Sequence, residues 1–265
     1  MGSVSLPELL AYDFLVLIGC MLLLWLISIR LGDVSFVDSF WAAGFVVVAA
    51  FAYCFAGGDG AQRQLVLIVT AVWGSRLALY LFWRWRHDGP DARYVAMVAR
   101  VKGSVPLFTL KNVFLLQGVM LWIVSLPIQF VMAAPAGAML GSLALAGGIL
   151  AAIGIFFETV GDWQMARFRA DPANKGQVMD RGLWRYTRHP NYFGDACVFW
   201  GLYLVALEVE HGMWSVFGPL LLTWTLVKWS GAALLERRLS RSKPGYEAYL
   251  ARTSSFIPWF PKKGK

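Results

Sequence analysis

A short polar and aromatic stretch, residues 181–195, holds the side chains with the clearest chemical potential. It reads Arg-Gly-Leu-Trp-Arg-Tyr-Thr-Arg-His-Pro-Asn-Tyr-Phe-Gly-Asp and lies between two apolar segments. Guanidinium groups suit phosphate oxygens, and aromatic rings offer faces on which a purine or nicotinamide can stack. The candidates are Arg181, Arg185 and Arg188 for phosphate and Trp184, Tyr186 and Tyr192 for stacking.

The same stretch enters an apolar helix through polar residues. Pro190 is well placed to begin a helix, and Asn191 and Asp195 then share one helix face. An amide and a carboxylate at the start of a membrane helix are costly unless they have a task. The alternative is a basic loop on the cytoplasmic face of a membrane, with no ligand at all.

The composition predicts a protein embedded in a membrane. Of 265 residues, 58% are apolar and 15% are charged, and the mean hydropathy is +0.57. Several runs reach the ~20 apolar residues that cross a bilayer. The net charge of +8 follows the expected membrane topology, so no nucleic-acid partner is expected. Cys20, Cys54 and Cys197 are scattered in apolar segments, which predicts neither a disulfide framework nor a metal site.

The predicted fold is an all-α integral membrane protein, a seven-transmembrane-helix bundle in one domain covering residues 1–265. Lipid leaves no partner for open backbone groups, so every span must be helical. Basic residues gather in 85–111, in 162–190 and in the tail. The positive-inside rule then places the N-terminus outside and the C-terminus in the cytoplasm, in the inner membrane if the chain is bacterial. The expected spans are residues 9–30, 35–57, 64–84, 112–134, 137–161, 191–208 and 212–235, followed by a cytoplasmic segment, 236–265.

Ionisable residues inside the first half of this bundle are candidate site residues. Asp38 begins the second span, where the helix dipole alone is an alternative reason for a carboxylate. Arg76, Tyr80 and Arg84 follow at intervals of four residues and form one polar stripe on the third span. Each would cost several kcal/mol if it faced lipid, so the stripe predicts a lined cavity.

The fifth span and the tail supply further candidates. Glu158, Asp162 and Arg169 follow helical spacing, so the carboxylates can accept hydrogen bonds from ribose hydroxyls and the arginine can meet phosphate. An internal ion pair with Arg76 is the structural alternative for either carboxylate. Glu236 adds an acidic group after the last span.

The cavity predicted from these residues opens to the cytoplasm and admits a lipophilic molecule from the bilayer. The chain has no GxGxxG after a strand, no P-loop and no metal-ligand cluster. A dinucleotide such as NADPH would therefore be held by helix side chains, and its phosphates match the supply of arginines. With a hydride donor bound, the protein must only orient an enone and polarise its ketone oxygen.

The stretch also carries a family resemblance. Gly182-Leu-Trp-Arg-Tyr186, followed by Arg188-His-Pro-Asn-Tyr-Phe-Gly-Asp195, resembles the C-terminal signature of the steroid 5-alpha-reductase family, especially its bacterial branch. The similarity continues through residues 246–258, and the sterol C14-reductases are similar as well. The resemblance implies NADPH-dependent reduction of the double bond of a Δ4-3-oxosteroid.

The resemblance also implies roles for particular residues. Asp38 and Trp73 match the positions of a catalytic glutamate and tyrosine of the animal enzymes, so a neutral Asp38 would donate to the ketone. The animal enzymes also carry glutamate at the position of Asp195. The residues that would hold NADPH are Arg76, Tyr80, Asp162, Arg169, Asn191 and Asp195.

Two other functions remain open. The isoprenylcysteine carboxyl methyltransferases share the Arg-His-Pro-x-Tyr core, which suggests a methyltransferase that binds S-adenosylmethionine through Arg188, His189, Pro190 and Glu236. A transporter or lipid-binding scaffold is the non-enzymatic reading, although no inverted repeat is evident. Whether His189 contacts a cofactor or only shapes the turn stays open. The expected partners are a lipophilic enone and membrane lipids, and the expected state is a monomer.

Overall fold

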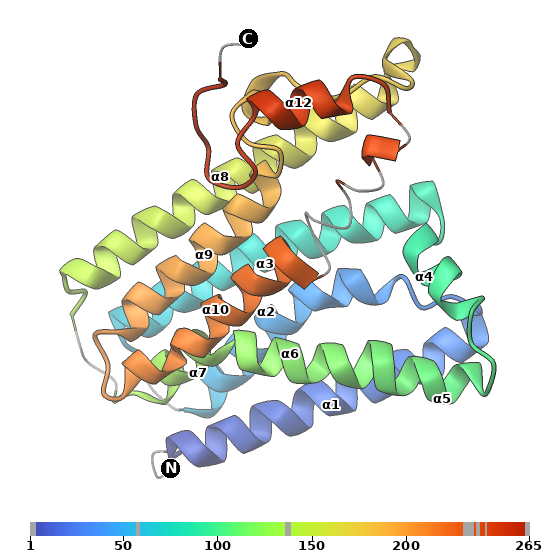
Figure 1. Ribbon diagram of the computed structural model, residues 1–265. Coiled ribbons are helices and arrows are strands. Elements are labelled where there is room, and N and C mark those ends of the chain that lie inside the picture. The colour runs from blue at the N-terminus through green and yellow to red at the C-terminus, as the bar shows by residue number, and fades with distance from the viewer. Residues whose placement is uncertain are drawn as a thin grey trace. The chain divides into compact units, whose positions relative to one another are not determined.

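The computed structural model describes residues 4–56, 59–135, 139–229, 236, 239–241 and 243–262. Their regular structure is helical and contains no strand, apart from one isolated bridge between Thr187 and Ser254. The all-helical class predicted from the sequence is confirmed (Figure 1). Within the described residues, five helices are long and apolar enough to cross a membrane, which makes this a multi-pass membrane protein. They are Leu6–Leu31 (α1), Val37–Phe55 (α2), Ala61–Asp88 (α3), Val105–Val124 and Ser142–Ala170 (α8).

The fourth expected span, residues 112–134, differs most from the structure. Val105–Val124 combines α5 (Val105–Thr109), a π-helical segment (Leu110–Leu115) and α6 (Leu116–Val124), and a separate helix α7 (Leu126–Ala133) follows. The break falls at Ser125 because Pro127 has no N–H for the helical ladder and its ring crowds the preceding turn.

The sixth expected span ends two residues earlier in the structure than in the prediction, and the seventh is described only up to Trp229. Helix α9, Pro190–Ala206, has 17 residues, and the ~20 residues that cross a bilayer would exceed it. Helix α10, Phe217–Trp224, continues as a π-helical segment, Thr225–Trp229, to the end of that described stretch. Five spanning helices are therefore shown, while seven spans and the orientation of the termini stay predictions.

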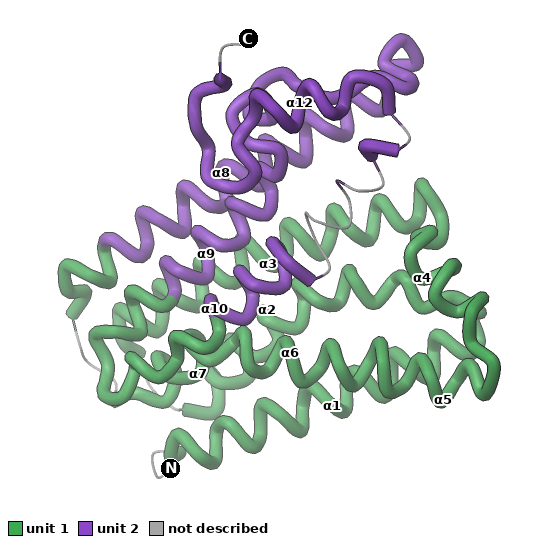
Figure 2. The backbone as a smooth tube through the Cα atoms, viewed as in Figure 1, with its two compact units in different colours: residues 1–145, 203–218 green, residues 146–202, 219–265 purple. Residues whose placement is uncertain are grey.

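The chain divides into two compact units (Figure 2). Unit 1 comprises residues 1–145 and 203–218, and unit 2 comprises residues 146–202 and 219–265. The single domain expected from the sequence stays a prediction. Both units are discontinuous in sequence, so neither corresponds to a simple N-terminal or C-terminal half.

Unit 1 is built around the packing of α2 against α3. A Cβ atom at Gly74 of α3 would approach the carbonyl oxygen of Ala42 in α2 to 2.9 Å, so the two backbones are in close contact there. Helices α1 and α6 lie side by side (Figure 1). Trp122 of α6 donates its indole N–H to the Leu10 carbonyl of α1 at 2.9 Å. These helices hold the residues that begin α2 against the connection that follows α3.

Unit 2 is organised by glycines between α8 and α9. A Cβ atom at Gly154 would lie 2.5 Å from the carbonyl oxygen of Gly194, and one at Gly194 would lie 2.6 Å from that of Gly154. The same approach recurs one heptad away, where a Cβ atom at Gly201 would lie 2.5 Å from the carbonyl oxygen of Gly147. Small residues permit such close helix packing in membranes. The contact fixes the start of α9, and with it the stretch 181–195.

The two long connections contain short helices. The 85–111 connection holds α4 (Ala92–Val98) and α5. The 162–190 connection begins as a continuation of α8 to Ala170 and then turns at Pro172–Asn174. A second 3-10 turn follows at Gly182–Arg185, and helix α12 (Tyr246–Arg252) lies near the C-terminus.

Candidate functional site

Asp38 lies at the centre of a hydrogen-bonded cluster in unit 1. The Tyr94 hydroxyl donates to Asp38 Oδ1 at 2.6 Å, and Arg93 Nη2 donates to Asp38 Oδ2 at 3.0 Å. Gln117 Nε2 in turn donates to the Tyr94 hydroxyl oxygen at 2.9 Å. The first turn of α2 (Asp38), α4 (Arg93 and Tyr94) and α6 (Gln117) thus converge on one carboxylate.

The position of α4 depends on Asp91. The Asp91 carboxylate accepts the backbone N–H of Arg93 at 2.8 Å, which caps the helix start. It also accepts Arg93 Nε at 3.0 Å and Arg93 Nη2 at 3.0 Å. Arg93 is therefore shared between Asp38 and Asp91, and its guanidinium is held in one orientation.

The electrostatics of the cluster keep Arg93 charged and Tyr94 protonated. Burial opposes the charge of Arg93, but hydrogen bonds and charge from Asp91 and Asp38 raise its pKa. Burial would also raise the pKa of Asp91, yet the hydrogen bonds from Arg93 and the charge of Arg84 lower it overall. Burial and the charge of Asp38 raise the pKa of Tyr94 well above its ordinary value. At neutral pH Tyr94 is a neutral hydroxyl beside a fixed cation.

The contacts change what is expected of Asp38. Both of its carboxylate oxygens accept hydrogen bonds, one from Tyr94 and one from Arg93. Such contacts suit a carboxylate that orients its neighbours, while a neutral Asp38 that donates to the ketone stays a prediction. Sequence reasoning missed Arg93 and Tyr94, because they lie in a connecting segment and match no motif. The nearest signal was Asp91, a helix-capping residue two positions before Arg93.

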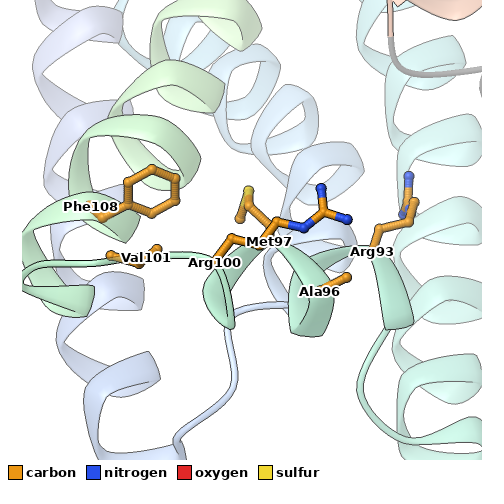
Figure 3. A pocket seen from close by; sticks show the side chains of 6 residues that line it. All are labelled: Arg93, Ala96, Met97, Arg100, Val101 and Phe108. Carbon is orange, nitrogen blue, oxygen red and sulfur yellow. The ribbon is translucent and has the colours of Figure 1, made fainter.

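A cavity of about 360 Å³ lies beside this cluster. Small-molecule sites commonly occupy about 300–1,000 Å³. Figure 3 shows the Arg100 guanidinium beside Met97, between Phe108 on one side and Arg93 on the other. The Arg100 side chain makes no hydrogen bond or ion pair with any described residue, so its charge is available to a ligand. The lining residues are Arg93, Ala96, Met97, Arg100, Val101 and Phe108.

The other predicted residues of unit 1 have different surroundings. Trp73 is only 1% exposed and packs edge-on against Phe45 at 5.6 Å between ring centroids, away from the cavity lining. Tyr80 stacks on Trp83 at 6.1 Å, and Arg76 is half-buried on α3. Arg84 is close enough for its charge to act on the carboxylates of Asp38 and Asp91. The structure therefore associates Arg84 with Asp38 but gives Trp73 a packing role.

In unit 2, Arg188, His189 and Glu236 form an ion-pair cluster. Arg188 Nε donates to Glu236 Oε1 at 2.8 Å and Arg188 Nη2 donates to Oε2 at 3.2 Å. His189 Nε2 lies 2.9 Å from Glu236 Oε1. Burial would raise the pKa of Glu236, but the contacts with His189 and Arg188 lower it. Arg188 Nη1 also donates to the carbonyls of Leu250 and Thr253, at 3.2 and 2.6 Å. A cofactor phosphate would have to compete for this arginine.

The predicted aromatic residues are divided between the interior and the surface. Trp184 is buried against Phe168 and Met179 and donates its indole N–H to the Gly161 carbonyl at 3.0 Å, so no face is open for stacking. His189 stacks on Tyr192 at 5.2 Å. Tyr186 is exposed and lines a second, apolar cavity of about 260 Å³. The other lining residues are Phe157, Leu183, Pro258, Trp259 and Phe260.

Two cations of unit 2, Arg169 and Lys243, lie near each other. Burial and the positive charge of Arg169 together lower the pKa of Lys243, which shows that the two cations are neighbours. Arg169 is exposed, as is Arg181. Lys243 was missed by the sequence reasoning because its proximity to Arg169 arises only in the fold.

The remaining predicted residues of unit 2 lie along α8 and at the start of α9. Glu158 and Asp162 are buried on α8. Asn191 and Asp195 are half-buried, one turn apart on α9, as the spacing predicted. The predicted cofactor-binding residues are thus divided between the two units.

Comparison with known proteins decides the family. A family model described as a protein of unknown function, DUF1295, matches residues 24–253. The chain belongs to this family. The assignment to the steroid 5-alpha-reductase family is therefore wrong: the match over most of the chain is to DUF1295, whereas the resemblance rested on a short C-terminal signature.

One curated protein is similar to most of this chain. The uncharacterized protein C594.04c of the fission yeast Schizosaccharomyces pombe is 23% identical over 271 residues, which cover 89% of this chain and 75% of that protein. No solved structure matches.

Proposed function

We propose that the protein is a membrane-bound reductase that uses NADPH to reduce the carbon–carbon double bond of a lipophilic enone. The observation that carries the proposal is the double role of Arg93, which lines the cavity of unit 1 and is fixed by Asp38 and Asp91. A preoriented cation at the wall of a cavity that also has apolar side chains is an arrangement that can polarise a carbonyl.

The chemistry assigns a task to each residue of the cluster. Hydride arriving at the β-carbon of an enone places negative charge on the ketone oxygen, which Arg93 and Arg100 would stabilise. Tyr94, which is protonated at neutral pH, is the proposed proton donor to the α-carbon. Asp38 acts as a positioning residue, because its contacts hold both Tyr94 and Arg93. Bound NADPH would supply the hydride.

The residues available for NADPH fit its phosphates. Arg169 and its neighbour Lys243 form a pair of cations in unit 2, and Arg181 adds an exposed guanidinium. Guanidinium and ammonium groups are the side chains that recognise phosphate. Carboxylates such as Asp162 can accept hydrogen bonds from ribose hydroxyls. We keep the predicted seven-span topology in this proposal, because it places the 85–111 and 162–190 connections on the cytoplasmic side, where NADPH is found.

The substrate class follows from the cavity lining. Met97, Val101 and Phe108 offer an apolar wall, and Arg100 offers a charge that no described residue neutralises. A molecule with an apolar body and a ketone oxygen suits this lining, and it would enter from the bilayer. A Δ4-3-oxosteroid as substrate was implied only by the rejected resemblance to the steroid 5-alpha-reductases. Steroids are therefore one class of test compound among several enones.

Methyl transfer from S-adenosylmethionine is the second candidate, and one observation favours it. Arg188 and His189, which such an enzyme would use together with Glu236, are both within hydrogen-bonding distance of the Glu236 carboxylate. Their contacts also have a purely structural explanation, since they join the start of α9 to the C-terminal segment. The Arg93 cluster has no role in this alternative.

The test is turnover by purified full-length protein in detergent. NADPH oxidation is followed with a panel of lipophilic enones, and the product is identified by mass spectrometry as the substrate plus two hydrogens. Tyr94→Phe and Arg100→Ala should each lower turnover at least tenfold, while the exposed neighbour Lys102→Ala should not. Turnover of no enone, or wild-type turnover in both site variants, would contradict the proposal.

A further inference from the structure

Asp13 is a carboxylic acid in an unusual place. It lies on α1, its exposed fraction is 0%, and neither carboxylate oxygen has a hydrogen-bond partner among the described residues. It shares its helix face with Leu9, Leu17 and Met21, which are equally buried. Neither the proposed reductase nor the predicted cofactor site uses this residue.

The two sequence neighbours of Asp13 show where its side chain points. Tyr12 packs against Phe55 of α2, and Phe14 packs against Trp122 of α6, both with ring centroids 5.5 Å apart. Successive residues of an α-helix are rotated by about 100°. Asp13 therefore points between α2 and α6, into the interior of unit 1.

No cation on the neighbouring elements compensates a charge at this position. The elements that pack against α1 are α2, the segment Leu110–Leu115, α6 and α7. Helices α6 and α7 carry no titratable group. The titratable groups of the other two elements are Asp38, Tyr53, Cys54 and Lys111.

Each of these four groups either has another contact or is exposed, or lies at a distant part of its helix. The Tyr53 hydroxyl donates to Asp59 at 2.5 Å, and Cys54 is exposed. Lys111 is the one cation among the four groups, and it is exposed. It lies five residues after Pro106, whose carbonyl accepts the indole N–H of Trp25. Trp25 is near the far end of α1 from Asp13. Asp38 is at the opposite end of α2 from Phe55, whose ring packs against Tyr12, the residue before Asp13. None of the groups on these four neighbouring elements therefore supplies a positive charge to Asp13.

The neighbouring helix break adds further buried polar groups. Gln129 Nε2 donates to the Trp122 carbonyl at 2.9 Å and to Ser125 Oγ at 2.7 Å. Gln129 Oε1 is buried and has no donor among the described residues. Trp122 of α6 therefore contacts Phe14, the residue after Asp13, and also Gln129. Gln129 is a second buried polar side chain with an unused acceptor oxygen.

An isolated carboxylate in an apolar interior is strongly disfavoured and is neutralised by a proton or by a bound cation. A hard metal ion needs about six oxygen ligands, and the described residues contain no group of three or more His, Cys, Asp or Glu side chains able to hold one. A proton needs only the carboxylate itself. We propose that Asp13 is a proton-binding site inside unit 1, occupied at neutral pH, and that its carboxylic acid reacts with hydrophobic carbodiimides.

The proposed labelling reaction needs no further reagent. The acid oxygen adds to the central carbon of the carbodiimide while the acid proton moves to one nitrogen. The O-acylisourea then rearranges to a stable N-acylurea. No atom is lost, so the labelled peptide gains the mass of the intact reagent. An ionised carboxylate lacks the proton for the first step, and exposed aspartates, with a pKa of about 3.9, are ionised at neutral pH.

The experiment treats the full-length protein, in its native membrane at neutral pH, with dicyclohexylcarbodiimide or with a water-soluble carbodiimide. Peptides are then analysed by mass spectrometry. Asp13 should be labelled at least tenfold more by the hydrophobic reagent than by the soluble one, and Asp13→Asn should abolish this label. Asp33 is the internal control: its carboxylate accepts hydrogen bonds from Ser35 and Trp85, and it should stay unlabelled.

Three results would overturn the inference. The first is an unlabelled Asp13 in a sample whose other buried carboxyls react. The second is protection of Asp13 by sodium ions at constant pH and ionic strength, which would indicate a cation site. The third is a large drop in melting temperature for both Asp13→Asn and Asp13→Leu, which would indicate an ionised group with a partner. A neutral acid predicts that Asp13→Asn melts within a few degrees of the wild type.

Discussion

Removing the carboxylate of Glu236 should destabilise unit 2. The substitution Glu236→Ala breaks the two-point contact with Arg188 and the contact with His189. Arg188 and Glu236 side chains are only 11% and 19% exposed, so water replaces the lost contacts poorly. The Arg188 guanidinium would retain only its bonds to the carbonyls of Leu250 and Thr253.

The size of the effect follows from these contacts. Hydrogen bonds to charged groups contribute about 1.5–3 kcal/mol each, and loss of one partner of a buried pair costs about 3–5 kcal/mol. Because this pair is partly exposed, we expect a loss of about 3 kcal/mol. That loss corresponds to a drop of roughly 6–12 °C in melting temperature for a protein of this size. Glu236→Gln keeps one acceptor oxygen and should lie between the wild type and Glu236→Ala.

The assay is thermal unfolding of the detergent-purified protein, with Asp180→Asn as the matched control. Asp180 pairs with Arg252 in the same unit, but their side chains are 35% and 46% exposed. Exposed pairs contribute about 0–1 kcal/mol, so the control should melt within roughly 3 °C of the wild type. Equal shifts in Glu236→Ala and Asp180→Asn would refute the reasoning.

The pH dependence of the melting temperature tests the contribution of Glu236 independently. The pKa of Glu236 is lowered in the folded protein, so its contribution is fully present above the unfolded-state pKa of about 4.3. The contribution is lost as the pH falls through the lowered folded-state value. The melting difference between wild type and Glu236→Gln should therefore be constant near neutrality and shrink in acid.

Three further predictions concern the site and the packing. Asp38→Asn should reduce enone turnover less than Tyr94→Phe, because an amide oxygen can still accept the hydrogen bond from Tyr94. Steady-state kinetics measure both losses, and equal losses would assign the donor role to Asp38. Turnover should persist to alkaline pH, because the pKa of Tyr94 lies well above its ordinary value; a fall near pH 8, measured by a pH–rate profile, would contradict this. Gly194→Val should destabilise the protein by more than about 2 kcal/mol in thermal unfolding, because its side chain would meet the backbone of Gly154 and Glu158, whereas Gly19→Val, in open space, should not.

The sequence was sufficient for the parts of the fold that depend on long apolar runs. Helices α1, α2, α3 and α8 are close to the expected spans because about 20 consecutive apolar residues can form only a helix in lipid. The boundary at Ser125 was missed although Pro127 was visible, because a proline in a membrane helix can either kink it or end it. Which of these happens depends on how the neighbouring helices satisfy the freed backbone groups.

The candidate site was only partly predictable, because its key contacts join distant residues. Asp38 was selected as an ionisable residue at the start of a span, but its partners Arg93 and Tyr94 come from a connection without a motif. Trp184 was expected to stack on a ligand because its neighbours are polar and basic. The fold instead buries its ring against Phe168 and Met179. Local spacing identifies candidate residues, whereas their partners depend on packing between segments.

The central claim is that the protein binds NADPH, and cofactor-dependent thermal stabilisation tests it most directly. Purified protein is melted with NADPH, NADH or S-adenosylmethionine, each at the same concentration. A ligand at 100 times its dissociation constant adds about 2.7 kcal/mol to the folded state, or roughly 5–11 °C here. We predict stabilisation by NADPH that is lost in Arg169→Ala and kept in Lys102→Ala. Stabilisation by S-adenosylmethionine alone, or by none of the three, would contradict the account.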